Sequence, residues 1–230
     1  MKITLEYIEN LSSDTKTFWF KKPPNFSYIA GQFIELYLPH KADDRGQKRW
    51  FTLSSAPSND LISITTKVIN KPSSFKNTLN KLQPGDEIEM SDTMGDFVLP
   101  RNKDIPLVFV AGGIGITPFH SMLSELASKK QKRNITLIYA ANDKESLVFE
   151  NELAKNCKLL PLLSDPPKDW TGLSGKLSAD RIINLVDIKN STRVYLSGPE
   201  KMVEAITRDL KTKVNPENVI TDYFPGYNSL

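Results

Sequence analysis

The pattern of apolar residues changes near residue 100, and this change limits the folds that are open to the chain. Before Pro100, apolar residues occur in short runs separated by turn residues, which is typical of antiparallel strands. After Ile105, apolar runs alternate with stretches of helical periodicity, which predicts strand–helix–strand units and a parallel sheet. We therefore expect a small antiparallel barrel over residues 1–102 and a parallel-sheet α/β domain over residues 103–230.

The expected elements follow from these runs and from the turn residues between them. In the first domain we expect strands at 3–8, 15–20, 32–38, 50–53, 61–68 and 87–90, and a helix at 74–82. In the second we expect strands at 106–111, 135–140, 158–163, 193–196 and 218–221, and helices at 118–129, 146–155, 178–186 and 200–211.

Composition excludes several classes of protein. Lys and Arg number 30 against 27 Asp and Glu, and the net charge of +3 is too small to suggest nucleic-acid binding. One cysteine, Cys157, and two histidines, His40 and His120, exclude a disulfide framework, a four-cysteine zinc or iron–sulfur site and a His-rich metal site. No secretory signal or membrane-spanning apolar stretch is visible, so we expect a soluble cytoplasmic protein without a metal site.

A glycine-rich turn carries the strongest functional signal. The segment from Val110 to Pro118 (VAGGIGITP) follows an expected buried strand and opens an expected helix. Glycines let phosphates approach the backbone, and a helix N-terminus offers free N–H donors. Pro118 suits the first helical turn, but the segment lacks the third glycine of the Rossmann fingerprint. We expect a phosphate-bearing ligand here; the alternative is a tight turn that binds nothing.

Four segments, in order, resemble motifs of the ferredoxin–NADP reductase family of flavoproteins. Residues 49–57 (RWFTLSSAP) resemble its flavin motif Arg-x-Tyr-Ser/Thr, and residues 95–100 (GDFVLP) resemble the Gly-x-Phe segment that closes the flavin domain. Residues 112–118 (GGIGITP) resemble its pyridine-nucleotide loop, and residues 195–202 (YLSGPEKM) resemble its Cys-Gly-Pro motif near the nicotinamide. The resemblance covers nearly the whole chain and implies an antiparallel FAD-binding barrel followed by an NAD(P)-binding domain.

For the barrel, the resemblance implies residues that bind FAD. Arg49 would pair with the pyrophosphate, Phe51 (in place of the family's usual tyrosine) would lie against the isoalloxazine, and Thr52 would place its hydroxyl beside flavin N5. The plainer alternatives are a surface ion pair, a core aromatic residue and an ordinary strand threonine. The other residues implied in FAD binding are Trp50, Lys67, Val68, Ser73 and Ser74, with N-capping by Ser74 as the alternative for the serine pair.

For the second domain, the resemblance implies a nucleotide site. Ser197 replaces the family's cysteine and, with Thr52, is expected to face the hydride path. Asp143 is expected to repel a 2′-phosphate and thus to favour NADH over NADPH, with helix capping as the alternative. Phe224 or Tyr227 is expected to cover the second flavin face or, alternatively, to anchor the chain end. The other residues implied in nucleotide binding are Gly112, Gly113, Gly115, Thr117, Gly198 and Pro199.

The resemblance therefore implies an FAD-dependent NAD(P)H oxidoreductase, which takes hydride from NADH or NADPH and releases electrons to an acceptor. The chain has neither the cysteines for a plant-type iron–sulfur domain nor the length for a globin. We expect the acceptor to be a small molecule or a separate one-electron carrier such as ferredoxin, flavodoxin or an oxygenase component. The alternative is a non-catalytic flavin- or nucleotide-binding subunit of a larger electron-transfer complex.

Overall fold

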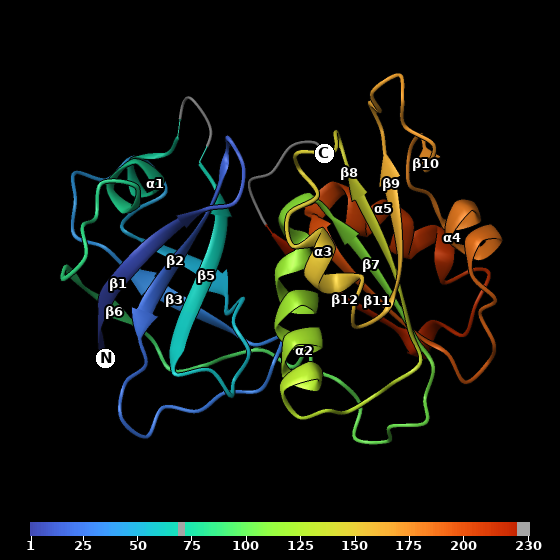
Figure 1. Cartoon of the computed structure of the whole chain (residues 1–230), viewed down its shortest axis with the longest axis horizontal. Coiled ribbons are helices and arrows are strands. Elements are labelled where there is room, and N and C mark those ends of the chain that lie inside the picture. Colours follow the sequence, from blue (N-terminus) through green and yellow to red (C-terminus); the bar gives the residue numbers. More distant parts are fainter. Residues whose placement is uncertain (69–71, 225–230) are drawn as a thin grey trace.

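The computed structural model describes residues 1–68 and 72–224, which form two six-stranded sheets lying side by side (Figure 1). The first sheet has the order β4-β3-β6-β1-β2-β5 and is antiparallel. Leu53, directly after β4, pairs with Ile64 of β5, so the two edge strands meet and the sheet closes into a barrel. Its elements are β1 (Lys2–Asn10), β2 (Thr15–Lys21), β3 (Phe33–Tyr37), β4 (Lys48–Thr52), β5 (Leu61–Lys67), α1 (Ser74–Leu79) and β6 (Glu87–Met90).

The barrel forms because alternate residues of its strands are apolar. In β3, Ile34 and Leu36 are buried while their neighbours stay partly exposed, which is the period of a strand covered on one face. Phe75 and Leu79 of α1 are fully buried against the same core. Burial of one such side chain stabilises the fold by about 2 kcal/mol.

The second sheet has the order β10-β9-β8-β7-β11-β12 and is parallel. Every residue of β7 is buried, because Leu107 and Phe109 face the core packed by α2 and α3 while Val108 and Val110 face the core packed by α4 and α5. The elements are β7 (Leu107–Gly112), η1 (Gly113–Ile116), α2 (Thr117–Ser128), β8 (Ile135–Ala141), α3 (Glu150–Leu153), β9 (Lys158–Leu163), β10 (Leu173–Ser174), α4 (Ala179–Leu185), β11 (Arg193–Pro199), α5 (Glu200–Leu210), η2 (Pro216–Asn218) and β12 (Val219–Phe224).

The fold class predicted from the sequence is confirmed, and most expected elements lie within a few residues of their predicted bounds. The expected helix 146–155 was wrong in its first part, because Asp143 accepts a hydrogen bond from the Ser146 N–H and holds residues 143–146 in a turn before α3. The sequence did not predict η1, η2 or the two-residue β10. The division into domains at residue 102 stays a prediction.

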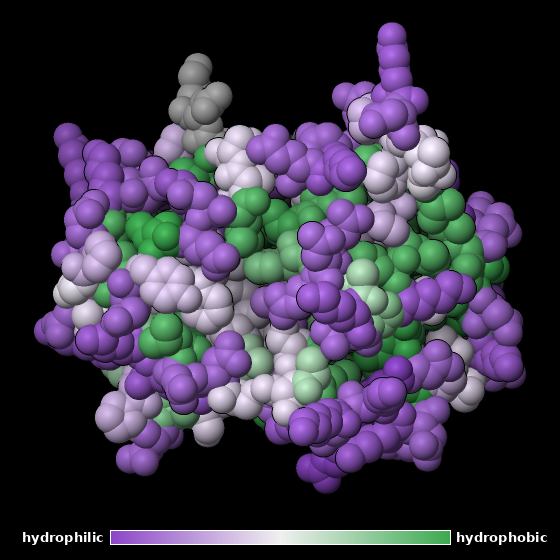
Figure 2. Space-filling model, viewed as in Figure 1, coloured by the Kyte–Doolittle hydropathy of each residue, from purple (hydrophilic) through white to green (hydrophobic). Residues whose placement is uncertain are grey.

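Within the described ranges, no helix has both the length and the hydropathy needed to cross a membrane. Figure 2 shows hydrophilic residues around most of the rim of one face and hydrophobic residues in several places over both domains. Helix α2 lies between the two sheets (Figure 1), so their junction is the place to look for a site built from both domains.

Candidate functional site

Two segments singled out in the sequence meet at one edge of the parallel sheet. β7 ends at Gly112, where the chain enters η1, and β11 ends at Pro199. The two strands are parallel neighbours, with Ser197 paired to Ala111. The glycine turn and the Ser-Gly-Pro segment therefore come together at the carboxyl ends of the strands, where ligands bind in sheets of this kind.

Packing between these two segments requires the glycines. A Cβ on Gly115 would lie 2.3 Å from the carbonyl oxygen of Ser197, and one on Gly112 would lie 2.6 Å from the sulfur of Met202. Gly113 has a φ of 52°, in the left-handed region that favours glycine. The sequence analysis explained these glycines by the approach of a phosphate. The structure shows that Gly112 and Gly115 leave room for the Ser-Gly-Pro segment itself.

The start of η1 is where backbone N–H groups can meet an anion, because α2 follows η1 directly and the Thr117 N–H already donates to the carbonyl oxygen of Ile114. No side chain caps either helix, and Pro118 occupies the first turn of α2 as predicted. The buried Thr117 hydroxyl donates to the carbonyl oxygen of Ile114 at 3.2 Å, so it is already used within the turn. A phosphate would thus be held by backbone N–H groups and by the positive end of the helix dipole.

Ser197 is fully buried, and its hydroxyl has no hydrogen-bond partner among the described residues. An unsatisfied buried hydroxyl is uncommon and needs an explanation, such as a ligand. In the register of β11 and β12, Ser197 lies opposite Asp222. Burial raises the pKa of Asp222 to about 6, and the charge of Asp96 in the barrel domain adds to the rise. The sequence analysis missed Asp222, although it directly precedes the terminal aromatic residues.

The end of β4 presents its side chains in alternate directions. Phe51 is 8% exposed and packs on Phe75 of α1, with ring centroids 5.9 Å apart. Trp50 is 62% exposed and lies against Phe33 on the outer face, at 6.0 Å. Thr52 ends the strand and is buried. Phe51 thus belongs to the barrel core, and flavin contact by Trp50, Phe51 or Thr52 stays a prediction.

Arg49 already holds a carboxylate. Its Nη2 lies 3.4 Å from Oδ1 of Asp43, and its Nη1 donates to the carbonyl oxygens of Arg45 and Lys48, each at 2.6 Å. Asp43 also accepts a hydrogen bond at 3.0 Å from the backbone N–H of Ser74, the main reason that the pKa of this carboxyl lies well below its usual range. Two of the residues assigned to the FAD pyrophosphate, Arg49 and Ser74, therefore meet around one anion, the carboxylate of Asp43.

The serine pair at the start of α1 has divided roles. The N-cap is Ser73, whose hydroxyl accepts from the Lys76 N–H at 3.3 Å, so the capping role proposed for Ser74 was wrong by one residue. The hydroxyl of Ser74 instead accepts from the Asp43 N–H at 2.9 Å and lies 3.0 Å from Nε2 of His40. Ser74 thus supports the loop that carries Asp43.

The remaining FAD candidates of the barrel lie at the end of β5. The ammonium of Lys67 pairs with Asp14 at 3.2 Å, and the Val68 N–H donates to the Asp14 carbonyl oxygen at 2.6 Å. The side chain of Phe224 and the whole of Tyr227 lie outside the described residues, so the covering of a second flavin face stays a prediction.

Helix α2 joins the glycine turn to the barrel. Nδ1 of His120 lies 2.7 Å from the carbonyl oxygen of Ser54, and the Ser121 hydroxyl donates to the carbonyl oxygen of Ser55 at 2.6 Å. Both carbonyl groups belong to the segment directly after β4. The helix that starts at the glycine turn therefore binds the segment after β4, which belongs to residues 49–57. Neither His120 nor Ser121 was predicted from the sequence to belong to the site.

Asp143 follows β8 at the carboxyl edge of the sheet, beside the glycine turn that follows β7. The side chain is exposed, and its carboxylate is bonded to the Ser146 N–H at 2.9 Å. It caps a turn and not the helix that the alternative interpretation assumed. Its role in choosing the nucleotide stays a prediction.

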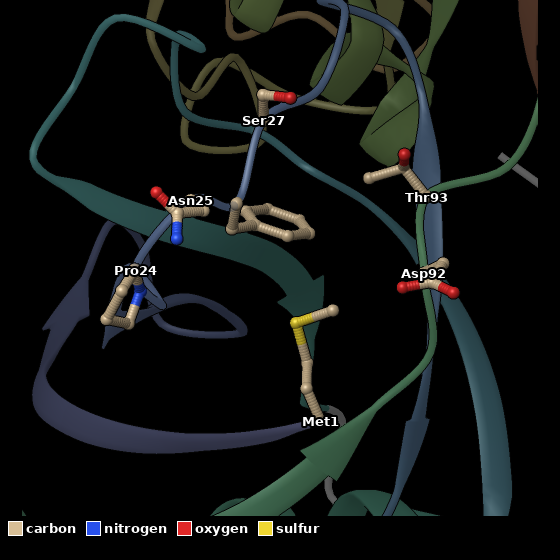
Figure 3. A pocket seen from close by; sticks show the side chains of 7 residues that line it. Met1, Pro24, Asn25, Ser27, Asp92 and Thr93 are labelled. Carbon is tan, nitrogen blue, oxygen red and sulfur yellow. The ribbon is translucent and has the colours of Figure 1, made fainter.

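A hollow of about 330 Å³ lies elsewhere on the barrel, between Met1, the segment 24–27 and the pair Asp92 and Thr93 (Figure 3). None of the residues that line it belongs to the four motifs. We therefore place the candidate site at the junction of the domains and not in this hollow.

The residues at the junction fit FAD and a pyridine nucleotide. The uncapped turn at Gly112 suits a diphosphate, the unpartnered hydroxyl of Ser197 suits a polar ring substituent, and Arg49 with the Ser74 N–H already holds an anion. When bound, the two groups supply hydride and electron transfer, while the protein supplies orientation and electrostatics.

Comparison with known proteins agrees with this assignment. Residues 2–99 match the family described as the oxidoreductase FAD-binding domain, and residues 109–208 match the oxidoreductase NAD-binding domain. Flavohemoprotein A of Dictyostelium discoideum is 29% identical over 228 residues, which is 93% of this chain and 57% of that protein. The chain spans little more than half the length of the first curated relatives that it matches.

Solved structures share the fold at low identity. The cytochrome P450 reductase GcoB of Amycolatopsis superimposes with a TM-score of 0.82 at 22% identity, over 97% of this chain and 70% of that one. A ferredoxin NADP⁺ reductase of Neisseria gonorrhoeae with bound FAD and NADP gives 0.81 at 22% identity, over 97% and 98%. The two matched domains, in this order, show that the chain is an oxidoreductase built from an FAD-binding domain followed by an NAD-binding domain, on the fold of these two reductases.

Proposed function

We propose that the chain oxidises NADH, with FAD as the hydride acceptor, and passes the electrons to a separate protein or small molecule. The observation that carries the proposal is the buried, unpartnered hydroxyl of Ser197 at the sheet edge where the glycine turn lies. Helix α2 connects this edge to the end of β4 through His120 and Ser121. The two halves of a hydride-transfer site are thus joined by one helix.

The phosphates of the two ligands are proposed to bind at opposite ends of the site. The FAD pyrophosphate would take the place that the Asp43 carboxylate occupies beside Arg49, because phosphate matches the planar guanidinium fork and carries more charge than a carboxylate. The nucleotide diphosphate would bind the N–H groups after Gly112. Each phosphate then lies against groups that favour negative charge.

Thr52 and Ser197 are proposed to line the path between the nicotinamide and the flavin. Both hydroxyls are buried at strand ends, one in each domain. A hydroxyl donates or accepts a hydrogen bond without adding charge, so it can orient a ring that changes its redox state. Burial of both groups also keeps bulk water from the transferring hydride.

Asp143 is proposed to favour NADH. A carboxylate at the end of the second strand of the domain repels a 2′-phosphate and accepts hydrogen bonds from ribose hydroxyls. The neighbouring Lys144 is a cation that would oppose the discrimination. Asp143 lies two residues after the end of β8, nearer the strand end than Lys144, and this is the reason that we give it the larger effect.

The acceptor is proposed to be a one-electron carrier protein, of the class of ferredoxin, flavodoxin or an oxygenase component. The support is analogy of fold: one structure of similar fold is named a cytochrome P450 reductase and another a ferredoxin NADP⁺ reductase. The second candidate function, a non-catalytic electron-transfer subunit, shares the same cofactor sites but transfers no hydride from a free nucleotide.

Reduction of an artificial dye tests the proposal. The FAD-loaded chain is mixed with the dye and with NADH or NADPH in parallel, and Thr52→Val serves as the matched variant. We expect turnover with both nucleotides, faster with NADH, and slower turnover in the variant. A yellow protein that reduces no dye with either nucleotide would support the subunit function instead.

A further inference from the structure

His120, near the start of α2, is buried in the junction between the two domains. The residue is only 6% exposed, although its ring has two polar nitrogens. Nδ1 lies 2.7 Å from the carbonyl oxygen of Ser54, and Nε2 lies 3.1 Å from a carboxylate oxygen of Glu152 in α3. One side chain of α2 therefore bonds both to the barrel and to a second helix of its own domain.

Both partners of the ring are hydrogen-bond acceptors. A backbone carbonyl has no proton to donate. The Glu152 side chain is half-exposed, and its carboxyl is ionised near neutral pH as glutamate ordinarily is. The Ser124 hydroxyl donates to the other oxygen of the same carboxylate at 2.9 Å. A neutral imidazole has a single N–H and leaves one of its two contacts unmade, whereas an imidazolium makes both.

Phe149 favours the same charged form of the ring. Its ring stacks on that of His120 with centroids 3.8 Å apart and 19° between the planes. A cation over an aromatic face is stabilised, and more so where water is excluded. Phe149 also has a φ of 64°, which a bulky residue adopts only where surrounding contacts enforce it. The stack is therefore a feature that this part of the fold maintains against local strain.

Few other charges face the ring. Just after α3, Lys155 adds to the lowering of the Glu152 pKa. On α2, Glu125 pairs with Lys129 at 2.6 Å and accepts from a barrel N–H. From the barrel, the described contact of the ring is the uncharged Ser54 carbonyl. Asp222, whose pKa burial raises to about 6, is a second titratable group of the junction, so the His120→Gln variant is needed to separate the two.

The location of this contact connects it to the site. His120 lies one turn along the helix that starts at the nucleotide turn, and Ser54 follows the flavin-motif residue Thr52 by two positions. The adjacent bond from Ser121 to Ser55 joins the same two elements without any charged group. It therefore provides a matched control within the same interface.

We propose that His120, as an imidazolium, is a positioning residue that fixes the nucleotide-binding turn relative to the flavin-binding end of β4, and that loss of its second proton loosens this junction. The effect on hydride transfer rests on the proposed function. The charge state of the His120 ring and the amide exchange rates at the junction do not depend on the proposed function, so they are tested separately.

Nitrogen NMR of the holoenzyme labelled with ¹⁵N-histidine tests the charge state. The chain contains only His40 and His120, and a His120→Gln variant assigns the signals. His40 is the internal control, because one of its nitrogens faces the Ser74 hydroxyl, which can donate or accept. Near pH 7 we expect two protonated nitrogens in His120 and one in His40. A neutral tautomer of His120 at that pH would overturn the proposal.

Amide hydrogen exchange of the holoenzyme tests the junction. His120→Gln keeps one donor and loses the charge, Glu152→Gln changes only the half-exposed partner, and Ser121→Ala removes the neutral bond. We expect residues 54–58 and the first turn of α2 to exchange about tenfold faster in His120→Gln, the ratio that loss of a bond of about 1.4 kcal/mol produces. Wild-type exchange at these positions in His120→Gln would overturn the positioning role.

Rapid-mixing kinetics add the link to function. For the wild type, we expect the limiting rate of flavin reduction by NADH to fall at the pH where the NMR signals show that His120 loses its second proton. His120→Gln should be slow at every pH with an unchanged Kd for NADH, while Ser121→Ala should keep the wild-type pH profile. An unaltered pH profile in His120→Gln would contradict the inference.

A wild type that NADH does not reduce at any pH would refute the proposed function. The NMR and hydrogen-exchange experiments would then still test the positioning role of His120.

Discussion

Ser197 and Asp222 lie opposite each other in the parallel register of β11 and β12, a buried hydroxyl that bonds to no described residue beside a carboxyl whose pKa is raised to about 6. Asp96, which contributes to this shift, comes from the barrel domain. The edge of the parallel sheet is therefore electrostatically coupled to the first domain, and this coupling can be measured.

We predict that Asp222→Asn stabilises the protein at neutral pH. Because burial raises the pKa of Asp222 from 3.8 to about 6, the folded state binds the proton more tightly than the unfolded state. Its contribution to stability is thus complete below about pH 4 and is lost as the pH rises through about 6. Urea unfolding should show a gain of about 1–2 kcal/mol for the variant at pH 7 and little at pH 4. Asp96→Asn should move the titration of Asp222 downward; equal gains at both pH values would contradict the assignment.

We predict that Ser197→Ala leaves the stability of the protein almost unchanged. In residues 1–68 and 72–224 its hydroxyl has no partner to lose, whereas the Ser55 hydroxyl, equally buried, accepts from the Ser63 N–H at 2.9 Å. Ser55→Ala should therefore destabilise by about 1–2 kcal/mol and Ser197→Ala by less than about 0.5 kcal/mol. Urea unfolding gives the free energy of unfolding of the two variants. A large loss of that free energy in Ser197→Ala would mean that the hydroxyl has a structural partner.

We predict that Thr52→Val and Ser197→Ala slow flavin reduction more than they weaken nucleotide binding. Both hydroxyls are uncharged groups at strand ends, so they contribute to orientation more than to the binding of phosphates. Stopped-flow reduction should show lower limiting rates with Kd for NADH changed by less than about twofold. Unchanged rates in both variants would show that other residues line the hydride path.

We predict that Arg49→Ala weakens retention of FAD. Loss of a charge-assisted phosphate contact costs about 1.5–3 kcal/mol, or roughly tenfold to a hundredfold in Kd. Arg45→Ala is the matched control, because Arg45 pairs with the same Asp43 but is exposed. If the pyrophosphate displaces Asp43 from Arg49, Asp43→Asn should retain FAD at least as well as the wild type. Equilibrium dialysis measures the Kd for FAD of the three variants. Equal retention of FAD in Arg49→Ala and Arg45→Ala would exclude the role of Arg49 in binding the pyrophosphate.

We predict that Asp143→Ser raises the efficiency with NADPH relative to NADH by about tenfold, which corresponds to about 1.4 kcal/mol. Removal of the carboxylate removes the repulsion of the 2′-phosphate, and serine can still cap the turn at Ser146. Steady-state kinetics with both nucleotides give the ratio. A wild type that already prefers NADPH would refute the role of Asp143.

The fold could be predicted because its signals are local. The continuous apolar run of β7 reflects burial on both faces, and the glycine turn reflects a close approach of two segments. The same logic failed at residues 146–149, where helical periodicity was present but the Asp143 turn and the left-handed Phe149 delay the start of α3.

The missed residues depend on tertiary contacts. In the sequence, His120 is simply a residue on the apolar side of a predicted helix. Only the folded structure shows that Ser54 and Glu152 contact its two ring nitrogens. Asp222 becomes distinctive only when strand pairing places it opposite Ser197 and near Asp96. No spacing in the sequence encodes these partners, because each belongs to a segment far along the chain.

Anaerobic titration of the FAD-loaded chain with NADH tests the central claim most directly. Hydride transfer requires the nucleotide and flavin sites to meet at the junction, so we predict that the yellow absorbance of the flavin is lost after about one equivalent of NADH. Flavin absorbance that stays unchanged with excess NADH and with excess NADPH would contradict the account.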